Sequence, residues 1–474
     1  MTSYDLLVIG AGAAGSTAAT TAASNGARVA LVERDKMGGT CLNYGCDPTK
    51  TLLHIAHMLY QARHAKTYGL QIPQANVAWD KVQDYVKQVI TTIRGGTPDE
   101  ANAAMRKQGI AVLEGEASFV SPHEVTIAGE KVTAERIIIA SGSQTVVPPI
   151  EGLADAGFLT NVEAIALPTL PKRMAIIGGG AIGVEFAQLF QRFGVQITIV
   201  EQSAHILDKE DRELADLLRN LLSKEGIRFK TGTALQRVER TDDGKRLTFE
   251  HEKAGQEELL VDEVLLALGR RPTLEKLNLE AAGVKTTKKG IVVDEYLRSS
   301  TPHIWAAGDV ASPYQFTHVA YEQGKLAAQN AFSQQPQAFD NRVIPWVTYT
   351  TPALAHVGQT EEQLREAGID YKVSRMKFSE VERAISQGQT DGMVKLLVDQ
   401  QDKILGAHIL GARADDLLAR FSSPCRTTCQ SKQSPPQSSL ILRWARVCAG
   451  PPIAYKLTFG AIADTKAPAQ TCNL

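Results

Sequence analysis

The chain has 474 residues, of which 43% are hydrophobic and 22% are charged, and its formal net charge is −1. This length allows about three domains of ordinary size, and the near-zero charge gives no reason to expect binding to nucleic acid or to an anionic membrane surface. No apolar run approaches the roughly 18 residues that span a bilayer. The six cysteines are too few for a disulfide scaffold, so we expect a reducing, cytoplasmic environment.

The N-terminal segment predicts a strand–loop–helix–strand unit that binds a nucleotide. A short apolar run over 4–9 is followed by the loop Gly10-Ala11-Gly12-Ala13-Ala14-Gly15, an alanine-rich helix, and a strand over 28–32 that ends at Glu33. In such a loop the first glycine permits a tight turn, the second lets the backbone approach a pyrophosphate, and the third packs helix against strand. The helix N-terminus offers N–H groups to phosphates, and the acid can bind a ribose.

Two cysteines follow, five positions apart, in the segment from Gly38 to Lys50. Pro48 predicts the first turn of a helix, so Cys46 would lie at a helix N-terminus, where a thiolate is favoured. A metal site would need two further ligands at short spacing, and none is nearby. The pair Cys41 and Cys46 is therefore predicted to be a catalytic dithiol. Helical, charge-mixed segments fill the chain up to residue 108.

A second copy of the nucleotide unit begins at residue 173. Its strand leads into Gly178-Gly179-Gly180-Ala181-Ile182-Gly183, a helix, and a strand that ends at Glu201, and the first glycine lies 23 positions before the acid in both copies. One such loop is a weak signal, and its glycines can serve turns alone, but two with equal spacing predict two dinucleotide-binding units. A carboxylate at Glu201 favours NAD(H) over NADP(H), because it accepts the 2′-hydroxyl and repels a 2′-phosphate.

Each unit closes with an apolar strand that enters a glycine turn, over 137–143 and 264–272. Both are predicted as buried parallel strands whose ends border a ligand crevice. A further apolar strand over 304–307 ends in Gly308-Asp309. After about residue 340 the predicted strands alternate with helices such as 360–367, which is typical of an antiparallel α+β domain. These C-terminal strands are predicted over 343–349, 392–399 and 404–410.

With these motifs the chain resembles the class I pyridine-nucleotide disulfide oxidoreductases, a flavin-dependent family that includes dihydrolipoamide dehydrogenase, glutathione reductase and mercuric reductase. The resemblance runs from Tyr4 to about Leu418. It rests on four motifs: residues 39–50, 178–185, 308–309 and 316–324. The segments 391–395 and 404–408 are similar to the dimerisation sheet of the family.

The resemblance implies an α/β architecture with two Rossmann-like dinucleotide-binding domains, for FAD and NAD(P), followed by an α+β C-terminal dimerisation domain. It implies a homodimer, because the family's site spans two subunits. The implied boundaries are 1–147 and 269–340 for the two parts of the FAD domain, 148–268 for the NAD(P) domain, 341–421 for the dimerisation domain, and 422–474 for an atypical tail.

The resemblance also implies roles for individual residues. Lys50 and Glu185 would pair beside the flavin, Cys46 would face it as a thiolate, and Cys41 would exchange with the substrate; these four are the expected catalytic residues. The residues expected to bind FAD are Gly10, Gly12, Gly15, Glu33, Thr40, Lys50, Ala117, Ser141, Gly142, Asp309 and Thr317. Those expected to bind the nicotinamide dinucleotide are Gly178, Gly180, Gly183, Glu185, Glu201 and Gly269.

The chain departs from the family pattern at two places. Asp47 follows the second cysteine where the family usually has an apolar residue, and its charge would raise the pKa of the thiol. The family also carries a His-Pro pair and a Glu near its end, whereas here no histidine follows His408. The segment 422–474 is rich in Ser, Pro and Gln, which indicates a low-complexity tail. Its cysteines include no adjacent pair of the mercuric-reductase kind.

A frameshift is a further hypothesis for this tail. When the third base of each codon is read with the first two of the next, residues 440–446 can encode His-Pro-Thr-Leu-Gly-Glu. The match falls where the resemblance predicts those residues. The nucleotide sequence across codons 418 to 474 tests this hypothesis.

Together these features predict an FAD-dependent NAD(P)H dithiol–disulfide oxidoreductase of the dihydrolipoyl dehydrogenase kind. Its partners would be a small-molecule or protein-bound disulfide or dithiol and a second copy of the chain, with no resident metal, nucleic acid or membrane. One alternative is a mercuric-type metal-ion reductase, because thiols that exchange with disulfides also bind soft metals. Another is a catalytically impaired flavoprotein or redox-sensing module, which the missing C-terminal His and Glu would favour.

Overall fold

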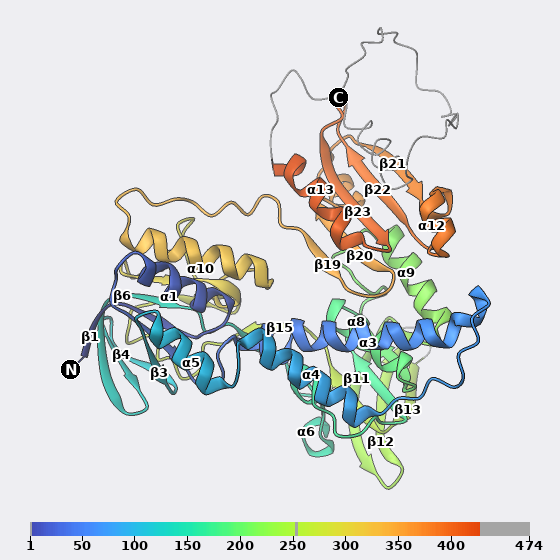
Figure 1. Ribbon diagram of the computed structural model, residues 1–474, viewed down its shortest axis with the longest axis horizontal. Coiled ribbons are helices and arrows are strands. Elements are labelled where there is room, and N and C mark those ends of the chain that lie inside the picture. Colours follow the sequence, from blue (N-terminus) through green and yellow to red (C-terminus); the bar gives the residue numbers. More distant parts are fainter. Residues whose placement is uncertain (1, 252–254, 427–474) are drawn as a thin grey trace.

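The structure is a computed structural model that describes residues 2–251 and 255–426, with side chains described over 3–251 and 255–421. The chain forms three sheet-based parts, and the second is inserted between two segments of the first (Figure 1). Most of the predicted tail, and with it the frameshift hypothesis, lies outside the described residues. Among those that are described, no helix is both long and apolar enough to cross a membrane.

The N-terminal sheet has the strand order β3-β2-β1-β6-β5-β4, and β18 also pairs with β6. Its strands are β1 Thr2–Ile9, β2 Val29–Glu33, β3 Ile110–Glu114, β4 Ala117–Ser121, β5 Glu124–Ile127, β6 Glu130–Ile139 and β18 Ile304–Ala306. The central strand β1 runs parallel to β2 and β6, with Ile9 opposite both Val32 and Ile139. The first glycine loop therefore leaves the sheet at the carboxyl ends of parallel strands. The chain leaves this sheet after β6 and returns to it with β18.

Two helices, α1 (Ala13–Ser24) and α10 (Thr317–Phe332), pack side by side against this sheet (Figure 1). Gly324 makes the close approach possible, because a Cβ there would lie 2.1 Å from the Ala14 carbonyl oxygen. The packing brings the N-terminal residues of α10 to the same end of the sheet as the first glycine loop. The elements η2 (Gly308–Val310) and α10 follow β18 directly.

The second glycine loop belongs to a parallel sheet of order β10-β9-β8-β14. Its strands and helices are β8 Arg173–Ile177, α8 Ala181–Arg192, β9 Gln196–Val200, α9 Arg212–Lys224, β10 Arg228–Lys230 and β14 Glu263–Leu266. An antiparallel sheet of β11 (Thr233–Thr241), β12 (Gly244–His251) and β13 (Gly255–Val261) precedes β14 and was not predicted from the sequence. The helices α6 (Leu153–Ala156) and α7 (Asn161–Ile165) precede β8.

A short ribbon of β7 (Ser143–Thr145) and β15 (Arg270–Pro272) joins the two chain segments that run between these sheets. A small pair, β16 (Thr286–Thr287) and β17 (Gly290–Ile291), lies further along the chain. Because β7 follows β6 and β15 follows β14, the ribbon ties the carboxyl ends of the parallel strands in the two sheets to each other.

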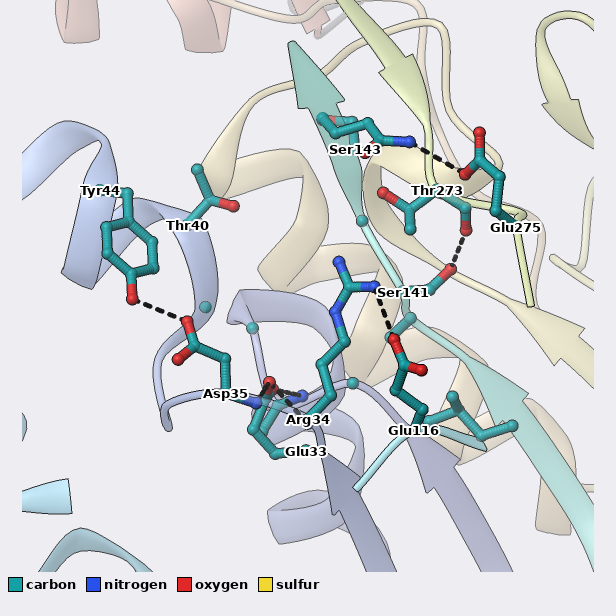
Figure 2. Close-up of a pocket in the computed structure, with 18 of the residues that line it drawn as sticks. Glu33, Arg34, Asp35, Thr40, Tyr44, Glu116, Ser141, Ser143, Thr273 and Glu275 are labelled. Atoms are coloured by element: carbon teal, nitrogen blue, oxygen red, sulfur yellow. Dashed lines mark hydrogen bonds and ion pairs between the residues drawn. The ribbon is translucent and has the colours of Figure 1, made fainter. Parts of the chain in front are cut away.

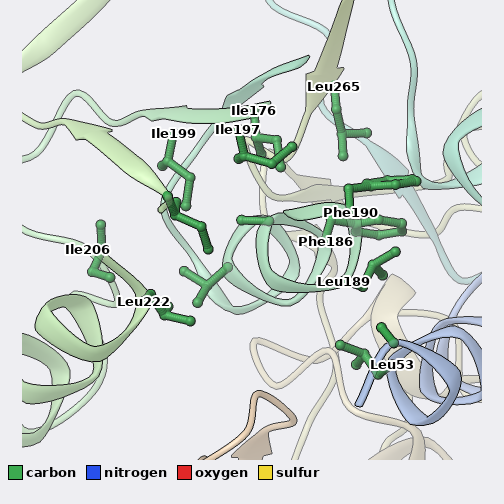
Figure 3. Packing of buried hydrophobic residues seen from close by; sticks show 14 of the residues in the cluster. Leu53, Ile176, Phe186, Leu189, Phe190, Ile197, Ile199, Ile206, Leu222 and Leu265 are labelled. Atoms are coloured by element: carbon green, nitrogen blue, oxygen red, sulfur yellow. The ribbon is translucent and has the colours of Figure 1, made fainter. Parts of the chain in front are cut away.

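The helical region predicted up to residue 108 consists of α2 (Gly39–Tyr44), α3 (Cys46–His64), η1 (Ala65–Tyr68), α4 (Trp79–Arg94) and α5 (Pro98–Lys107). The long helix α3 packs on α8, and Leu53 shares a buried cluster with Phe186, Leu189 and Phe190 (Figure 3). Strands β8, β9 and β14 contribute Ile176, Ile197, Ile199 and Leu265 to this cluster. The helix that starts at the second cysteine is thus fixed against the second nucleotide unit.

The C-terminal sheet is antiparallel, with the order β19-β20-β23-β22-β21. Its elements are β19 Trp346–Thr348, β20 Ala353–Gly358, α11 Glu361–Glu366, β21 Lys372–Lys377, η3 Phe378–Glu380, α12 Glu382–Gln387, β22 Met393–Val398, β23 Ile404–Gly411 and α13 Ala414–Arg426. The strand predicted over 343–349 is thus confined to 346–348. The predicted fold class, with two dinucleotide-binding sheets and an α+β C-terminal part, is confirmed.

Candidate active site

A cavity of about 420 Å³ opens at the carboxyl ends of β1, β2 and β6, beside the first glycine loop (Figure 2). Of the residues predicted to bind FAD, seven line it: Gly10, Gly12, Glu33, Thr40, Ala117, Ser141 and Gly142. Gly15 lies buried beneath the loop, where a Cβ would come within 1.7 Å of the Gly10 carbonyl oxygen. It therefore has a packing role, as the loop motif predicts.

The shape of the glycine loop fits the pyrophosphate of a dinucleotide. Gly10 has φ +101°, and a Cβ there would lie 2.4 Å from the Ala140 carbonyl oxygen. A Cβ on Gly12 would meet nothing closer than 3.9 Å, so the start of α1 is left open. Glu33 accepts hydrogen bonds from the backbone N–H groups of Ala11 at 2.8 Å and Arg34 at 2.9 Å. These contacts hold its carboxylate at the end of β2, beside the loop, where a ribose would lie.

Asp309 does not line the cavity directly but supports its wall through Ser143. The Ser143 hydroxyl donates to the Asp309 carboxylate at 2.6 Å and accepts from Arg270 Nε at 2.8 Å. Burial raises the pKa of Asp309, while Ser143 and Arg270 oppose this rise. Arg270 also donates to the Ser143 carbonyl oxygen at 2.6 Å. Asp309 and Gly269 were predicted as site residues from the sequence, whereas Ser143 and Arg270 were not. Ser143 and Arg270 nevertheless stand in the glycine-turn motifs at the ends of the closing strands.

The two cysteines of the dithiol lie on two consecutive helices. Cys41 is part of α2, and Cys46 is the first residue of α3, as the proline at position 48 predicted. Both cysteines are free thiols and half-buried. Cys46 Sγ lies 3.5 Å from Thr317 Oγ1 at the start of α10. Thr317 therefore contacts the dithiol and does not line the cavity.

The two thiols have opposite pKa shifts. The pKa of Cys46 is lowered to about 6, first because Cys41 hydrogen-bonds to its thiolate and then because Thr317 and Lys50 add to this, while burial opposes it. The hydrogen bond to Cys46, burial and the repulsion of its charge raise the pKa of Cys41 well above its usual range. Asp47 does raise the pKa of both thiols through its charge, as predicted, but it is the smallest of these influences. The reduced pair thus holds one thiolate, on Cys46.

Lys50 and Glu185 form an ion pair at 2.6 Å that links α3 to α8. The Glu185 side chain is 7% exposed, and its other oxygen accepts the backbone N–H of Tyr349 at 2.8 Å. The Lys50 ammonium also lies 4.5 Å from the centre of the Tyr349 ring. The pair predicted from the resemblance is therefore present in the structure, and Tyr349, which the sequence did not single out, completes it.

The second glycine loop repeats the geometry of the first. Gly178 has φ +113°, and a Cβ on Gly183 would lie 2.0 Å from the Gly178 carbonyl oxygen, whereas a Cβ on Gly180 would meet no atom within 4 Å. Glu201 accepts the Gly179 N–H at 2.6 Å. Gly269 has φ +96° and also faces open space. This loop therefore leaves room for a second pyrophosphate.

Over the described ranges, no group of three or more His, Cys, Asp or Glu side chains is placed to hold a metal ion. The arrangement instead combines two dinucleotide loops with a half-buried dithiol, and a lysine–glutamate pair joins the dithiol helix to the second unit. A site of this kind defines a nucleotide-dependent thiol–disulfide oxidoreductase.

Comparison with known proteins agrees with this class. The sequence pattern of "Pyridine nucleotide-disulphide oxidoreductase" matches residues 4–324, and that of its "dimerisation domain" matches 344–433. The mercuric reductase of Staphylococcus aureus is 37% identical over 418 residues, 88% of this chain and 76% of the relative. The dihydrolipoyl dehydrogenase of Thermus scotoductus is 38% identical over 425 residues, 88% of this chain and 90% of the relative.

A similar solved structure is the HOCl-induced flavoprotein disulfide reductase RclA from Escherichia coli. It has a TM-score of 0.79 and 31% identity, and the match covers 92% of this chain and 98% of RclA. The chain belongs to the pyridine nucleotide–disulphide oxidoreductase family, as the sequence motifs predicted. FAD and a pyridine nucleotide are the cofactors of this family, and bound FAD supplies the transfer of an electron pair between the nucleotide and the dithiol.

Proposed function

We propose that the chain uses NAD(H) to exchange electrons with a small-molecule or protein-bound disulfide, as the dihydrolipoyl dehydrogenases do. The observation that carries the proposal is the thiolate-favouring environment of Cys46, between Thr317 and Lys50. A thiolate at neutral pH is the form that attacks a disulfide, here the mixed disulfide that Cys41 forms with the substrate. The reducing conditions of the cytoplasm suit such a pair.

Within this proposal the residues have distinct roles. The first glycine loop, Glu33, Thr40, Ala117, Ser141 and Gly142 hold FAD, and Asp309 and Thr317 support its site. Cys46 keeps the internal thiolate and Cys41 meets the substrate. Lys50 and Glu185 orient each other beside the flavin. Domain boundaries at 147, 268, 340 and 421 follow from the same assignment, and a homodimer is expected because the chain carries a dimerisation domain.

An anaerobic titration with NADH tests the proposal. A long-wavelength absorbance band on two-electron reduction, typical of a thiolate beside a flavin, is expected in the wild type and should be lost in Cys46→Ser. Flavin-loaded protein that shows no such band would contradict the proposal and favour a binding or sensing module. Cys41→Ser serves as the matched control, because it removes substrate exchange but keeps Cys46.

The preference for NAD(H) is a second part of the proposal. The Glu201 carboxylate is held at the end of β9 by the N–H groups of Gly179 and Ser203, at 2.6 and 2.8 Å. A fixed carboxylate there binds a 2′-hydroxyl and repels a 2′-phosphate. We expect kcat/KM to favour NADH over NADPH and Glu201→Gln to reduce that ratio about tenfold or more, since one good polar contact is worth about 1.4 kcal/mol. An unchanged ratio would contradict this part.

A metal-ion reductase of the mercuric type is the second candidate. Two free thiols in a half-buried site suit a soft metal ion, and both the mercuric reductase relatives and a Cu(II) complex of RclA point the same way. The decisive measurement is the rate of NADH oxidation with Hg(II) or Cu(II) compared with lipoamide, under anaerobic conditions. A rate that is higher with a metal ion than with every disulfide tested would favour this candidate.

A further inference from the structure

The segment between the two cysteines is folded back on itself. Cys41 lies in α2 and Cys46 begins α3, and the single residue Gly45 separates the two helices. A Cβ on Gly45 would lie 2.9 Å from the Thr40 carbonyl oxygen, so the backbone at this turn passes close to the residue before Cys41. The placement of these two short stretches of chain therefore sets the distance between the two thiols.

Asn43, which the sequence did not single out, lies in the middle of this segment and is 6% exposed. Its side-chain amide donates to the carbonyl oxygens of Met37 at 3.0 Å and Gly39 at 2.9 Å. These carbonyls belong to the turn that leads into α2, where Gly38 and Gly39 have φ +94° and +59°. One side chain thus ties α2 to the turn that precedes it.

The turn that Asn43 holds lies directly against the first glycine loop. The Gly38 N–H donates to the Ala11 carbonyl oxygen at 3.0 Å. A Cβ on Gly39 would lie 2.7 Å from the Gly12 Cα atom, so the two backbones are in close contact. Asn43 therefore connects the dithiol segment to the backbone that lines the cavity beside this loop.

Two further side chains hold the same segment from other elements. Arg94, the last residue of α4, donates to Asn43 Oδ1 at 2.7 Å, which turns the amide N–H groups toward their carbonyl partners. On the other side, Asn161 at the start of α7 donates to the Tyr44 carbonyl oxygen at 2.5 Å. Both asparagines are buried within a single chain, 6% and 8% exposed, so these contacts do not require a second subunit.

We propose that Asn43, oriented by Arg94, is a positioning residue that keeps the two thiols close to each other and so stabilises their disulfide against the dithiol. Thiols held close have a high effective concentration toward each other, because the fold has already ordered them. Loosening the segment lowers that concentration and makes the disulfide easier to reduce. The inference concerns the redox-active disulfide of the family and holds for any nucleotide or substrate.

The equilibrium of the holoenzyme with dithiothreitol measures this effect. One reduced dithiothreitol molecule breaks the S–S bond of the protein, forms its own S–S bond and passes two protons to the protein thiols. After anaerobic equilibration at set ratios of reduced to oxidised reagent, free thiols are trapped with a maleimide. They are counted by mass spectrometry on the tryptic peptide 37–50, which carries both cysteines.

Asn43→Leu replaces the amide by an apolar group of similar size and removes all three hydrogen bonds. We expect the equilibrium constant for reduction of the disulfide to rise about tenfold, which is a change of about 30 mV in the potential of the dithiol. An equilibrium constant equal to that of the wild type would overturn the inference.

Asn330→Leu is the matched control. Asn330 is 5% exposed and donates to the carbonyl oxygens of Tyr296 at 3.0 Å and Gln337 at 2.9 Å, but it lies roughly 20 Å from Thr317 along α10. It should lose a comparable amount of stability in urea and keep the wild-type equilibrium constant. A shift of the same size in Asn330→Leu and Asn43→Leu would indicate general loosening of the fold and would count against the inference.

Arg94→Met tests the same role without changing the asparagine. Loss of the guanidinium leaves both carbonyl contacts possible but frees the amide to rotate, so the shift should have the same sign and be smaller, about threefold. This variant decides the question if Asn43→Leu does not fold, and an unchanged equilibrium constant in Arg94→Met then refutes the positioning role.

The pH dependence separates positioning from an effect on the thiolate. The pKa of Cys46 is lowered to about 6, so at pH 5 the reduced pair holds mostly two neutral thiols. A shift between wild type and Asn43→Leu that persists at pH 5 supports positioning, because it does not depend on the thiolate. A shift present at pH 7 and absent at pH 5 would contradict the inference, since Asn43 would then act through the charge of Cys46.

Discussion

At the scale of single residues, the reactivity of Cys46 is set by its immediate neighbours. Thr317 lies on α10, far away in sequence, yet its hydroxyl comes within 3.5 Å of the Cys46 sulfur. Its hydrogen bond and the charge of Lys50 both lower the pKa of the thiol. A hydrogen bond to a charged group contributes about 1.5–3 kcal/mol, so removing one should have a measurable effect.

Thr317→Val should raise the lower apparent pKa of the reduced pair by about one unit, while Thr317→Ser, which keeps the hydroxyl, should leave it near 6. The thiolate fraction grows as pH rises through that pKa, so the variant should be alkylated more slowly by iodoacetamide near pH 6.5. The measurement is the alkylation rate as a function of pH, assigned to the pair because the two thiols are coupled. Equal profiles for the Val and Ser variants would contradict this role of Thr317.

The pair of Lys50 and Glu185 shows what the sequence could and could not reveal about single residues. Its two members were predicted from the resemblance, because each stands in a recognisable motif. Tyr349, Ser143 and Arg270 were not singled out, since no local pattern marks a residue whose role depends on a contact from another element. Contacts of this kind are set by tertiary packing, which a motif does not encode.

Lys50→Met and Glu185→Gln should each destabilise the protein, and the double variant should be less destabilised than the sum of the two. We expect a coupling of about 1–2 kcal/mol, because Glu185 is buried but Lys50 retains some exposure to water. Urea unfolding of the four proteins provides the comparison. Additive losses would show that the two side chains do not interact in solution.

At the scale of elements, glycines decide how helix and strand meet in each nucleotide unit. The strands β8 and β9 were predicted, because they are buried on both faces and form continuous apolar runs in the sequence. The antiparallel strands β11 to β13 were missed, because mixed charged and apolar residues there give no clear period. Strands that are continuous apolar runs are thus more easily found in this chain than strands of mixed composition.

Two alanine substitutions in one loop separate packing from binding. Gly183→Ala places a methyl group 2.0 Å from the Gly178 carbonyl oxygen and should cost about 2–3 kcal/mol of stability, as overpacking usually does. Gly180→Ala meets no atom within 4 Å and should unfold at nearly the wild-type temperature. It should instead raise KM for NADH, because the methyl group fills the space beside the helix N-terminus. Thermal unfolding and steady-state kinetics of both variants test this pair; a stable Gly183→Ala would contradict the packing role.

At the scale of the whole molecule, the C-terminal sheet docks on the second nucleotide unit through buried charges. Lys395 on β22 is 1% exposed and contacts Asp211 at 2.9 Å, Glu361 at 2.5 Å and Glu213 at 3.0 Å. Asp211 directly precedes α9 in the second unit, whereas Glu361 lies in α11 of the C-terminal part. The lysine stands in a motif that the sequence assigned to the dimerisation sheet, but its carboxylate partners are far apart in sequence and could not be inferred.

Lys395→Met should therefore weaken the attachment between these two parts, at a cost of about 3 kcal/mol, because it leaves the buried Asp211 without its cation. Glu361 and Glu213 would keep their ion pairs with Arg365 and Arg375. Burial alone would lower the pKa of Lys395, but its hydrogen bonds to Glu361, Asp211 and Glu213 raise it. For Glu361, burial acts to raise the pKa, yet the lysine and Arg365 bring it down from 4.5 to about 2.

A carboxyl group with a lowered pKa in the folded protein stabilises it above the pKa of the unfolded chain, and that contribution is lost as pH falls through the folded value. The difference in unfolding free energy between wild type and Lys395→Met should accordingly be largest near pH 7 and should shrink as pH falls from about 4.5 toward 2. Urea unfolding at a series of pH values measures it, with Lys395→Arg as the control that keeps a cation. A difference that stays constant with pH would show that the lysine acts through packing and not through its charge.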